Sequence, residues 1–138
     1  DLGTGGGFPG LVVSILAAER APNLSVIAVE SDVRKATFLR TVVREAGLQT
    51  SIISDRIEAL EPLEANILSA RALAPLPKLL SLIKPHLAEN AEAVFPKGEG
   101  YEAEVSESLE TWSFRIDTYP SKTNPGAAIL KLGDIERV

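Results

Sequence analysis

The sequence predicts an α/β fold: a doubly wound, mostly parallel sheet that ends in an antiparallel C-terminal hairpin. Three observations support this prediction. Short apolar runs rich in β-branched residues alternate with helical patterns, the connections between them are short, and a glycine-rich turn precedes the first helical pattern. In such sheets, ligands bind beyond the carboxyl ends of the strands.

The chain opens on Asp-Leu-Gly-Thr-Gly-Gly-Gly-Phe-Pro-Gly, so five of its first ten residues are glycine. Glycine permits left-handed backbone and lets a ligand approach closely. Pro9 suits the first turn of a helix, whose free N–H groups and positive dipole end can face a polar or anionic ligand group. Asp1 stands where a strand ends. We therefore expect a truncated first strand and a chain that is a fragment lacking its N-terminal segment.

The first half of the chain alternates helix and strand. A helix is expected over 11–21, ended by Pro22, and a buried strand over 25–30 that finishes in the acid Glu30. Ser31 or Asp32 can cap a helix over 33–46, with Gly47 as its stop. A strand over 50–54 follows, and 55–58 is a polar loop or a single helical turn.

The second half continues the alternation and ends in the hairpin. The patterns predict a strand over 65–69, a helix over 75–87 bent or ended by Pro85, and a strand over 91–95. A polar helix over 101–109 comes next. Alternating aromatic and polar residues over 112–119 and an apolar run over 126–132 flank a turn over 123–126, as in a β-hairpin.

Composition narrows the function classes. The 138 residues suit a single domain over 1–138, with no apolar run near the roughly 18 residues that a membrane span needs. The absence of cysteine excludes disulfides and thiolate metal sites and fits the cytoplasm, and one histidine makes a His-based metal site improbable. The net charge of −5 argues against indiscriminate polyanion binding but leaves room for a local basic patch.

Two ligand classes compete for the glycine turn. Gly5, Gly7 and Gly10 fit G-x-G-x-x-G, the dinucleotide fingerprint of NAD(P)-dependent oxidoreductases. Asp1, Gly3, Gly5 and Gly7 fit Asp-x-Gly-x-Gly-x-Gly, which resembles the first motif of class I S-adenosylmethionine (SAM)-dependent methyltransferases. The Asp1 carboxylate favours SAM, because a carboxylate accepts hydrogen bonds from an amine and from hydroxyls but repels a pyrophosphate.

Each of these residues also has a structural alternative. Asp1 can be a helix cap, Glu30 a solvated strand end, and Phe8 a staple between the turn and the core rather than a residue facing adenine. Arg71 can pair with Asp55, Glu58 or another carboxylate, and Lys97 can be solvated rather than bound to an RNA phosphate.

Several stretches together resemble one family, the bacterial small-subunit rRNA guanine-N7 methyltransferase RsmG, also called glucose-inhibited division protein B. They cover about residues 1–98, and the last forty residues resemble the family only loosely. The matching stretches are the opening turn through Gly10, Val29 to Ser31 with Arg34-Lys35 and Phe38 to Arg40, Arg56 to Glu58, Ser69 to Leu76, and Phe95 to Gly98.

The resemblance implies a Rossmann-like class I SAM-dependent methyltransferase fold that methylates N7 of one guanine in 16S rRNA of the small ribosomal subunit. It implies that Gly3 and Phe8 contact the cofactor, Glu30 its ribose, and Ile57 and Glu58 its adenine. Arg71 would line the site and bind the methionine carboxylate or an RNA phosphate.

The chemistry implied by the resemblance needs no general base, because N7 of guanine has a free lone pair. It also implies a cytoplasmic protein, which we expect to be monomeric and without a membrane anchor. Three alternatives stay open at this point: an NAD(P)-dependent oxidoreductase, a methyltransferase with another substrate, and a cofactor-binding module that has lost catalysis.

Overall fold

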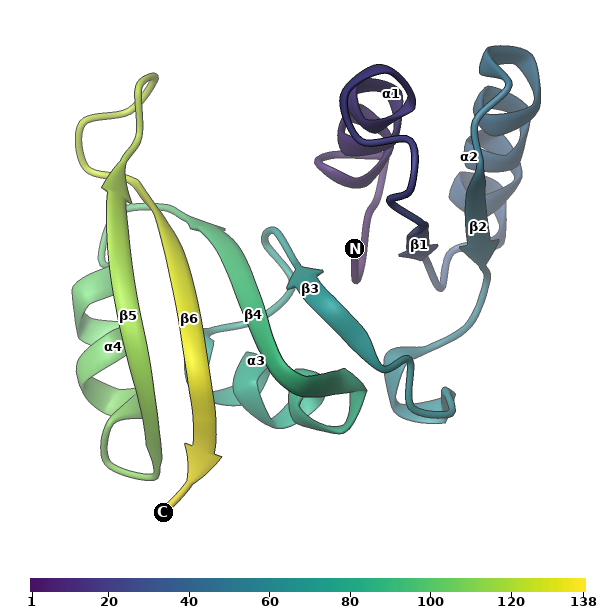
Figure 1. Ribbon diagram of the computed structural model, residues 1–138. Coiled ribbons are helices and arrows are strands. Elements are labelled where there is room, and N and C mark those ends of the chain that lie inside the picture. The colour runs from purple at the N-terminus through teal and green to yellow at the C-terminus, as the bar shows by residue number, and fades with distance from the viewer. The chain divides into compact units, whose positions relative to one another are not determined.

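A computed structural model describes residues 1–138. The chain forms two compact units, Asp1–Leu60 and Glu61–Val138 (Figure 1). No helix in the chain is both long and apolar enough to span a membrane.

The first unit is built on two parallel strands. It contains α1 (Gly10–Arg20), β1 (Val26–Val29), α2 (Val33–Ala46), β2 (Thr50–Ile53) and the 3₁₀ turn η1 (Ile57–Ala59). β1 pairs with β2 in parallel, and Leu2 forms a parallel bridge to Val29 on the other side of the same strand. The chain entering the glycine turn therefore runs beside β1 in strand register, as expected for the end of a first strand.

Local sequence signals fix the ends of α2. The Asp32 carboxylate accepts from the backbone N–H groups of Arg34 (2.9 Å) and Lys35 (3.1 Å), and these bonds help to hold the pKa of Asp32 below its usual value. Gly47 ends the helix at φ 65°, where its N–H reaches the carbonyls of the last turn. Both signals and the bounds 33–46 were predicted from sequence.

The second unit is a mixed four-stranded sheet with two helices. Its elements are β3 (Ala65–Ser69), α3 (Leu76–Ile83), the 3₁₀ turn η2 (Lys84–His86), β4 (Leu87–Lys97), α4 (Tyr101–Ser108), β5 (Trp112–Pro120) and β6 (Ala128–Arg137). The strand order is β3-β4-β6-β5. β3 and β4 are parallel, whereas β6 is antiparallel to both of its neighbours, which confirms the C-terminal hairpin.

The apolar face of α3 forms much of the core of this unit. Its buried residues are Leu76, Leu79, Leu80 and Ile83, at the helical spacing read from the sequence. They share the interior with Phe95 of β4 and with Leu130 and Leu132 of β6, all with no exposed surface. The expected helix over 75–87 is too long, because the α-helix ends at Ile83 and Pro85 lies in the 3₁₀ turn η2.

Candidate functional site

The glycine turn joins the end of the first strand to α1. Gly3, Gly5 and Gly7 have φ of 63°, 59° and 101°, in the region that L-residues with a side chain rarely adopt. Within the turn, the Gly7 N–H donates to the Thr4 carbonyl (2.9 Å), and the Leu11 N–H donates to the Gly7 carbonyl (2.8 Å) as the helix begins. The turn is thus a closed, hydrogen-bonded loop that leads directly into a helix N-terminus.

The turn has a packed side and an open side. A Cβ on Gly7 would lie 2.9 Å from Leu11 Cδ1, and a Cβ on Gly10 would lie 2.9 Å from both Cβ and Oδ2 of Asp1. At Gly5 and Gly6 nothing lies within 4 Å of such an atom. Gly6 is also exposed, so the open tip of the turn leaves room for a ligand against the backbone.

Asp1 caps the N-terminus of α1. Its Oδ2 accepts a hydrogen bond from the backbone N–H of Gly10 (3.0 Å), the first residue of α1, which has no side-chain cap from Pro9. A carboxylate at this position satisfies a free helix N–H and complements the helix dipole. The structure therefore realises the capping alternative for Asp1.

Glu30 ties the glycine turn to the start of α2. Its side chain follows β1 and is buried, with 7% of the residue exposed. Oε1 accepts from the Gly5 N–H and Oε2 from the Asp32 N–H, each at 2.9 Å. The alternative of a solvated strand end is wrong. A carboxylate has about four acceptor positions, so two bonds leave capacity for hydroxyl donors.

Ile57 and Glu58 lie just beyond the neighbouring strand. The Glu30 N–H donates to the Ile53 carbonyl (2.9 Å), so the ends of β1 and β2 are adjacent, and η1 starts four residues after Ile53. Ile57 is buried, whereas Glu58 is exposed. Phe8, with 57% of its surface exposed, does not act as a staple to the core. The first unit thus supplies eight of the nine predicted site residues.

Arg71, the ninth predicted residue, belongs to the second unit. It is exposed two residues after β3, and within that unit it forms no ion pair. It lines a groove of about 720 Å³, together with the loop that follows it, the end of β4 and the start of β6.

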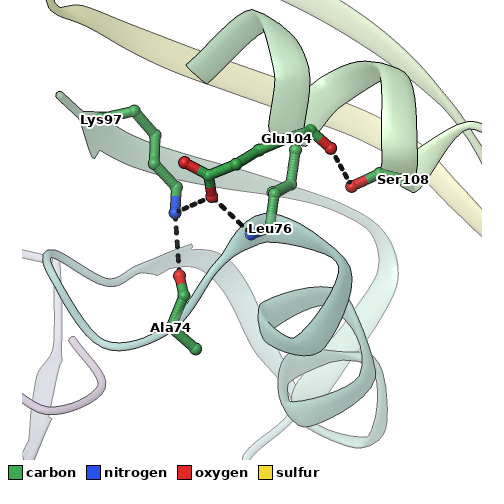
Figure 2. Close-up of polar contacts among 5 residues, drawn as sticks. All are labelled: Ala74, Leu76, Lys97, Glu104 and Ser108. Atoms are coloured by element: carbon green, nitrogen blue, oxygen red, sulfur yellow. Dashed lines mark hydrogen bonds and ion pairs between the residues drawn. The ribbon is translucent and has the colours of Figure 1, made fainter. Parts of the chain in front are cut away.

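Lys97 is not solvated, so that alternative is wrong. Its side chain is only 10% exposed, and its Nζ donates to the Ala74 carbonyl and to Glu104 Oε1, each at 2.9 Å (Figure 2). Sequence reasoning missed Glu104. The only available signal was an acidic residue in the first turn of the helix after Lys97, which many surface helices share.

The chain contains no group of three or more His, Cys, Asp or Glu side chains that could hold a metal ion.

Comparison with known families identifies the chain. The family model described as rRNA small subunit methyltransferase G (GidB) matches residues 1–124. The chain belongs to this family. A relative from Cereibacter sphaeroides (strain ATCC 17023) is 50% identical over 138 residues, and one from Ruegeria pomeroyi is 49% identical over the same length. Both are named ribosomal RNA small subunit methyltransferase G, and the chain spans 67% and 68% of their lengths.

Solved structures agree with the fold expected for a GidB family member. An RNA methyltransferase from Salinibacter ruber in complex with S-adenosyl-L-homocysteine has a TM-score of 0.69 at 18% identity, covering 96% of this chain and 77% of that one. A SAM-dependent methyltransferase from Aquifex aeolicus has a TM-score of 0.68 at 17% identity, covering 96% and 79%. These similarities confirm the Rossmann-like, class I methyltransferase fold.

The packed side of the turn predicts that Gly7→Ala destabilises the protein, whereas Gly6→Ala does not. At Gly7 a methyl group meets Leu11 and the φ of 101° is strained, at a cost of about 1–3 kcal/mol in the free energy of unfolding. At Gly6 the added methyl group meets open space. Urea unfolding of the two variants measures the difference, and equal stabilities would contradict the packing described here.

Proposed function

We propose that the protein binds SAM at the glycine turn and transfers its methyl group to N7 of a guanine in 16S rRNA of the small ribosomal subunit. The observation that carries the proposal is the Glu30 carboxylate bonded to the Gly5 N–H. Membership in the GidB family, with a model match over residues 1–124, supports the reaction class.

The residues present fit this cofactor. Open space beside Gly5 and Gly6 admits a ligand against the backbone, and the buried Glu30 carboxylate keeps acceptor positions for two adjacent ribose hydroxyls. A carboxylate at the end of β1 suits the ribose of SAM and the ribose of a dinucleotide alike. The preference for SAM rests instead on the Asp1 carboxylate, which would repel a pyrophosphate, and on membership in the GidB family.

The other roles follow the order of the chain. In the proposal Gly3, Gly5 and Gly7 shape the turn, and Asp1 holds it against α1 while accepting from the amine of the ligand, directly or through water. Phe8 approaches the cofactor from the glycine side. Ile57 covers one face of the adenine, and Glu58, or the backbone beside it, accepts from the exocyclic amine.

Catalysis in this proposal rests on positioning. SAM supplies an electrophilic methyl group on its sulfonium sulfur. N7 of guanine carries a free lone pair, so the protein need not remove a proton, and no side chain has to act as a base. The task of the chain is to hold the two reactants in line and keep water out, which can be worth about 7–11 kcal/mol in favourable cases. Arg71 would bind a phosphate of the RNA or the methionine carboxylate through its planar guanidinium.

We further propose that residues 1–138 act as one cofactor-binding domain. Two solved methyltransferase structures each match 96% of the chain, which supports this organisation. A protein of this function would work in the cytoplasm, as a monomer, on the small ribosomal subunit or its free RNA.

Calorimetric titration of the protein with SAM, S-adenosylhomocysteine and NAD tests the cofactor class. We expect heat of binding for the first two ligands and none for NAD, because the Asp1 carboxylate at the turn would repel the pyrophosphate of NAD. Binding of NAD instead would overturn the proposal and favour an oxidoreductase. If SAM binds but no methyl group reaches 16S rRNA, either naked or in the small subunit, the protein is a binding module or acts on another substrate.

Replacing Glu30 by Gln should weaken SAM binding by about 10- to 100-fold, because hydrogen bonds to a charged acceptor contribute about 1.5–3 kcal/mol. The amide nitrogen would also face a backbone N–H of Gly5 or Asp32. Isothermal titration gives the affinities, and Glu92→Gln serves as a control because that carboxylate pairs with Lys131 in the second unit. An unchanged affinity in Glu30→Gln would remove the ribose role from this residue.

Replacing Arg71 by Ala should lower kcat/KM for the RNA by about tenfold or more while the fold survives, because the side chain is exposed and makes no ion pair within its unit. Steady-state methyl transfer with separate variation of SAM and RNA shows which ligand the residue serves. Arg20→Ala, an exposed change at the end of α1, is the control. Normal turnover and normal affinity in Arg71→Ala would disprove the role.

A further inference from the structure

A partly buried ion pair ties three elements of the second unit together. Glu104 of α4 uses one oxygen, Oε1, to accept from Lys97 Nζ (2.9 Å) and from the backbone N–H of Leu76 (2.7 Å), the first residue of α3. Lys97, at the end of β4, also donates to the Ala74 carbonyl (2.9 Å). Figure 2 shows the two side chains meeting directly above the start of α3. Lys97 and Glu104 therefore bind the carbonyl of Ala74 and the N–H of Leu76, which are two residues apart in the chain.

The start of α3 lacks any other side-chain cap. Pro75, the residue before the helix, makes no capping hydrogen bond, and Pro77 has no N–H to offer. A carboxylate at this point satisfies a free N–H and complements the positive end of the helix dipole. Glu104 thus caps α3 from a different helix, and Ser108 Oγ donates to the Glu104 carbonyl (2.7 Å) one turn further along α4.

The segment held in this way carries Arg71. The loop of residues 70–75 connects β3 to α3, and Ala72 within it has φ 52°, a left-handed conformation that costs a residue with a side chain roughly 1–2 kcal/mol. A local conformation of this kind persists only when its surroundings fix it. The bonds to Ala74 and Leu76 fix the C-terminal end of the loop, two and four residues from the strained Ala72.

We propose that Lys97 and Glu104 are positioning residues, which hold the loop of residues 70–75 so that Arg71 faces the groove that it lines. They touch neither cofactor nor RNA and act through the Ala74 carbonyl and the Leu76 N–H. The proposal rests on the proposed methyl transfer, because that reaction gives Arg71 its task. A displacement of about 1 Å in a reacting or binding group can cost on the order of 100-fold in rate.

The test compares Lys97→Met, Lys97→Arg and Glu104→Gln. We expect Lys97→Met to lower kcat/KM for RNA by about 10- to 100-fold, and Lys97→Arg to recover most of that loss because its guanidinium can still donate to both oxygens. Glu104→Gln keeps an acceptor for the Leu76 N–H but loses the negative charge, so its kcat/KM should lie between those of Lys97→Met and Lys97→Arg. The affinity for SAM should stay within about twofold in all three variants.

Lys84→Met is the matched control. Lys84 Nζ also donates to a backbone carbonyl, that of Ile135 (2.6 Å), and pairs with a glutamate, Glu136 (3.0 Å), but at the other end of the sheet. If the role of Lys97 were only to stabilise the fold, both lysine variants would lower the unfolding temperature and neither would change kcat/KM below it. A Lys97→Met enzyme with kcat/KM within about twofold of the wild type would therefore overturn the proposal.

A second measurement does not depend on activity. Amide hydrogen exchange followed by NMR should show faster exchange at Leu76 and in the loop of residues 70–75 in Lys97→Met and Glu104→Gln, with no change there in Lys84→Met. If the wild-type protein transfers no methyl group, the proposed function fails, and this exchange pattern alone decides whether the pair holds the loop. Unchanged exchange at Leu76 and Ala74 would disprove it.

Discussion

The first unit depends on one buried carboxylate. Glu30 has 7% of its surface exposed, and such a charge is costly unless it is hydrogen-bonded. The backbone N–H groups of Gly5 and Asp32 supply those bonds from the two segments that flank the end of β1. The glycine turn and the start of α2 are thereby fixed to one point. The unit consequently presents a shaped backbone surface with a negative charge beneath it, before any ligand arrives.

The glycines of the turn perform different tasks, which their spacing alone does not distinguish. Gly7 and Gly10 are required by packing, because a Cβ would collide with Leu11 or Asp1, whereas Gly5 and Gly6 face open space. Asp1 is bonded to the helix that the turn starts. The sequence favoured SAM over a dinucleotide because of Asp1, and in the structure this carboxylate also caps the N-terminus of α1. Glu30 is buried and bonded to the turn itself, and its carboxylate suits a ribose, which SAM and a dinucleotide both carry.

Local sequence patterns predicted which helices and strands form. Pairing with neighbouring strands determined where β4 begins and where β6 ends. The bounds of α2 and β3 agree with the sequence analysis because a cap, a glycine stop and a short apolar run are local signals. By contrast, β4 begins at Leu87 rather than at 91, and β6 continues to Arg137 rather than to 132. Their partners Ala65 and Trp112 lie far away in the chain. The staple alternative for Phe8 and the solvated alternative for Lys97 are wrong for a related reason: exposure and ion pairing depend on neighbours that no motif encodes.

The ion pair of Lys97 with Glu104 also changes how the groove meets a polyanion. These two and Arg71 are the charged residues that line the groove. Because Lys97 and Glu104 neutralise each other, Arg71 is the one cation in that lining left for a ligand. In a chain with a net charge of −5, such a groove cannot attract RNA by a dense positive field. In the proposed function, selection of the RNA would come from the position of the Arg71 guanidinium, which lies on the loop between β3 and α3. The pair of Lys97 and Glu104 adds no net charge to the groove, and in our proposal it acts by fixing the position of Arg71.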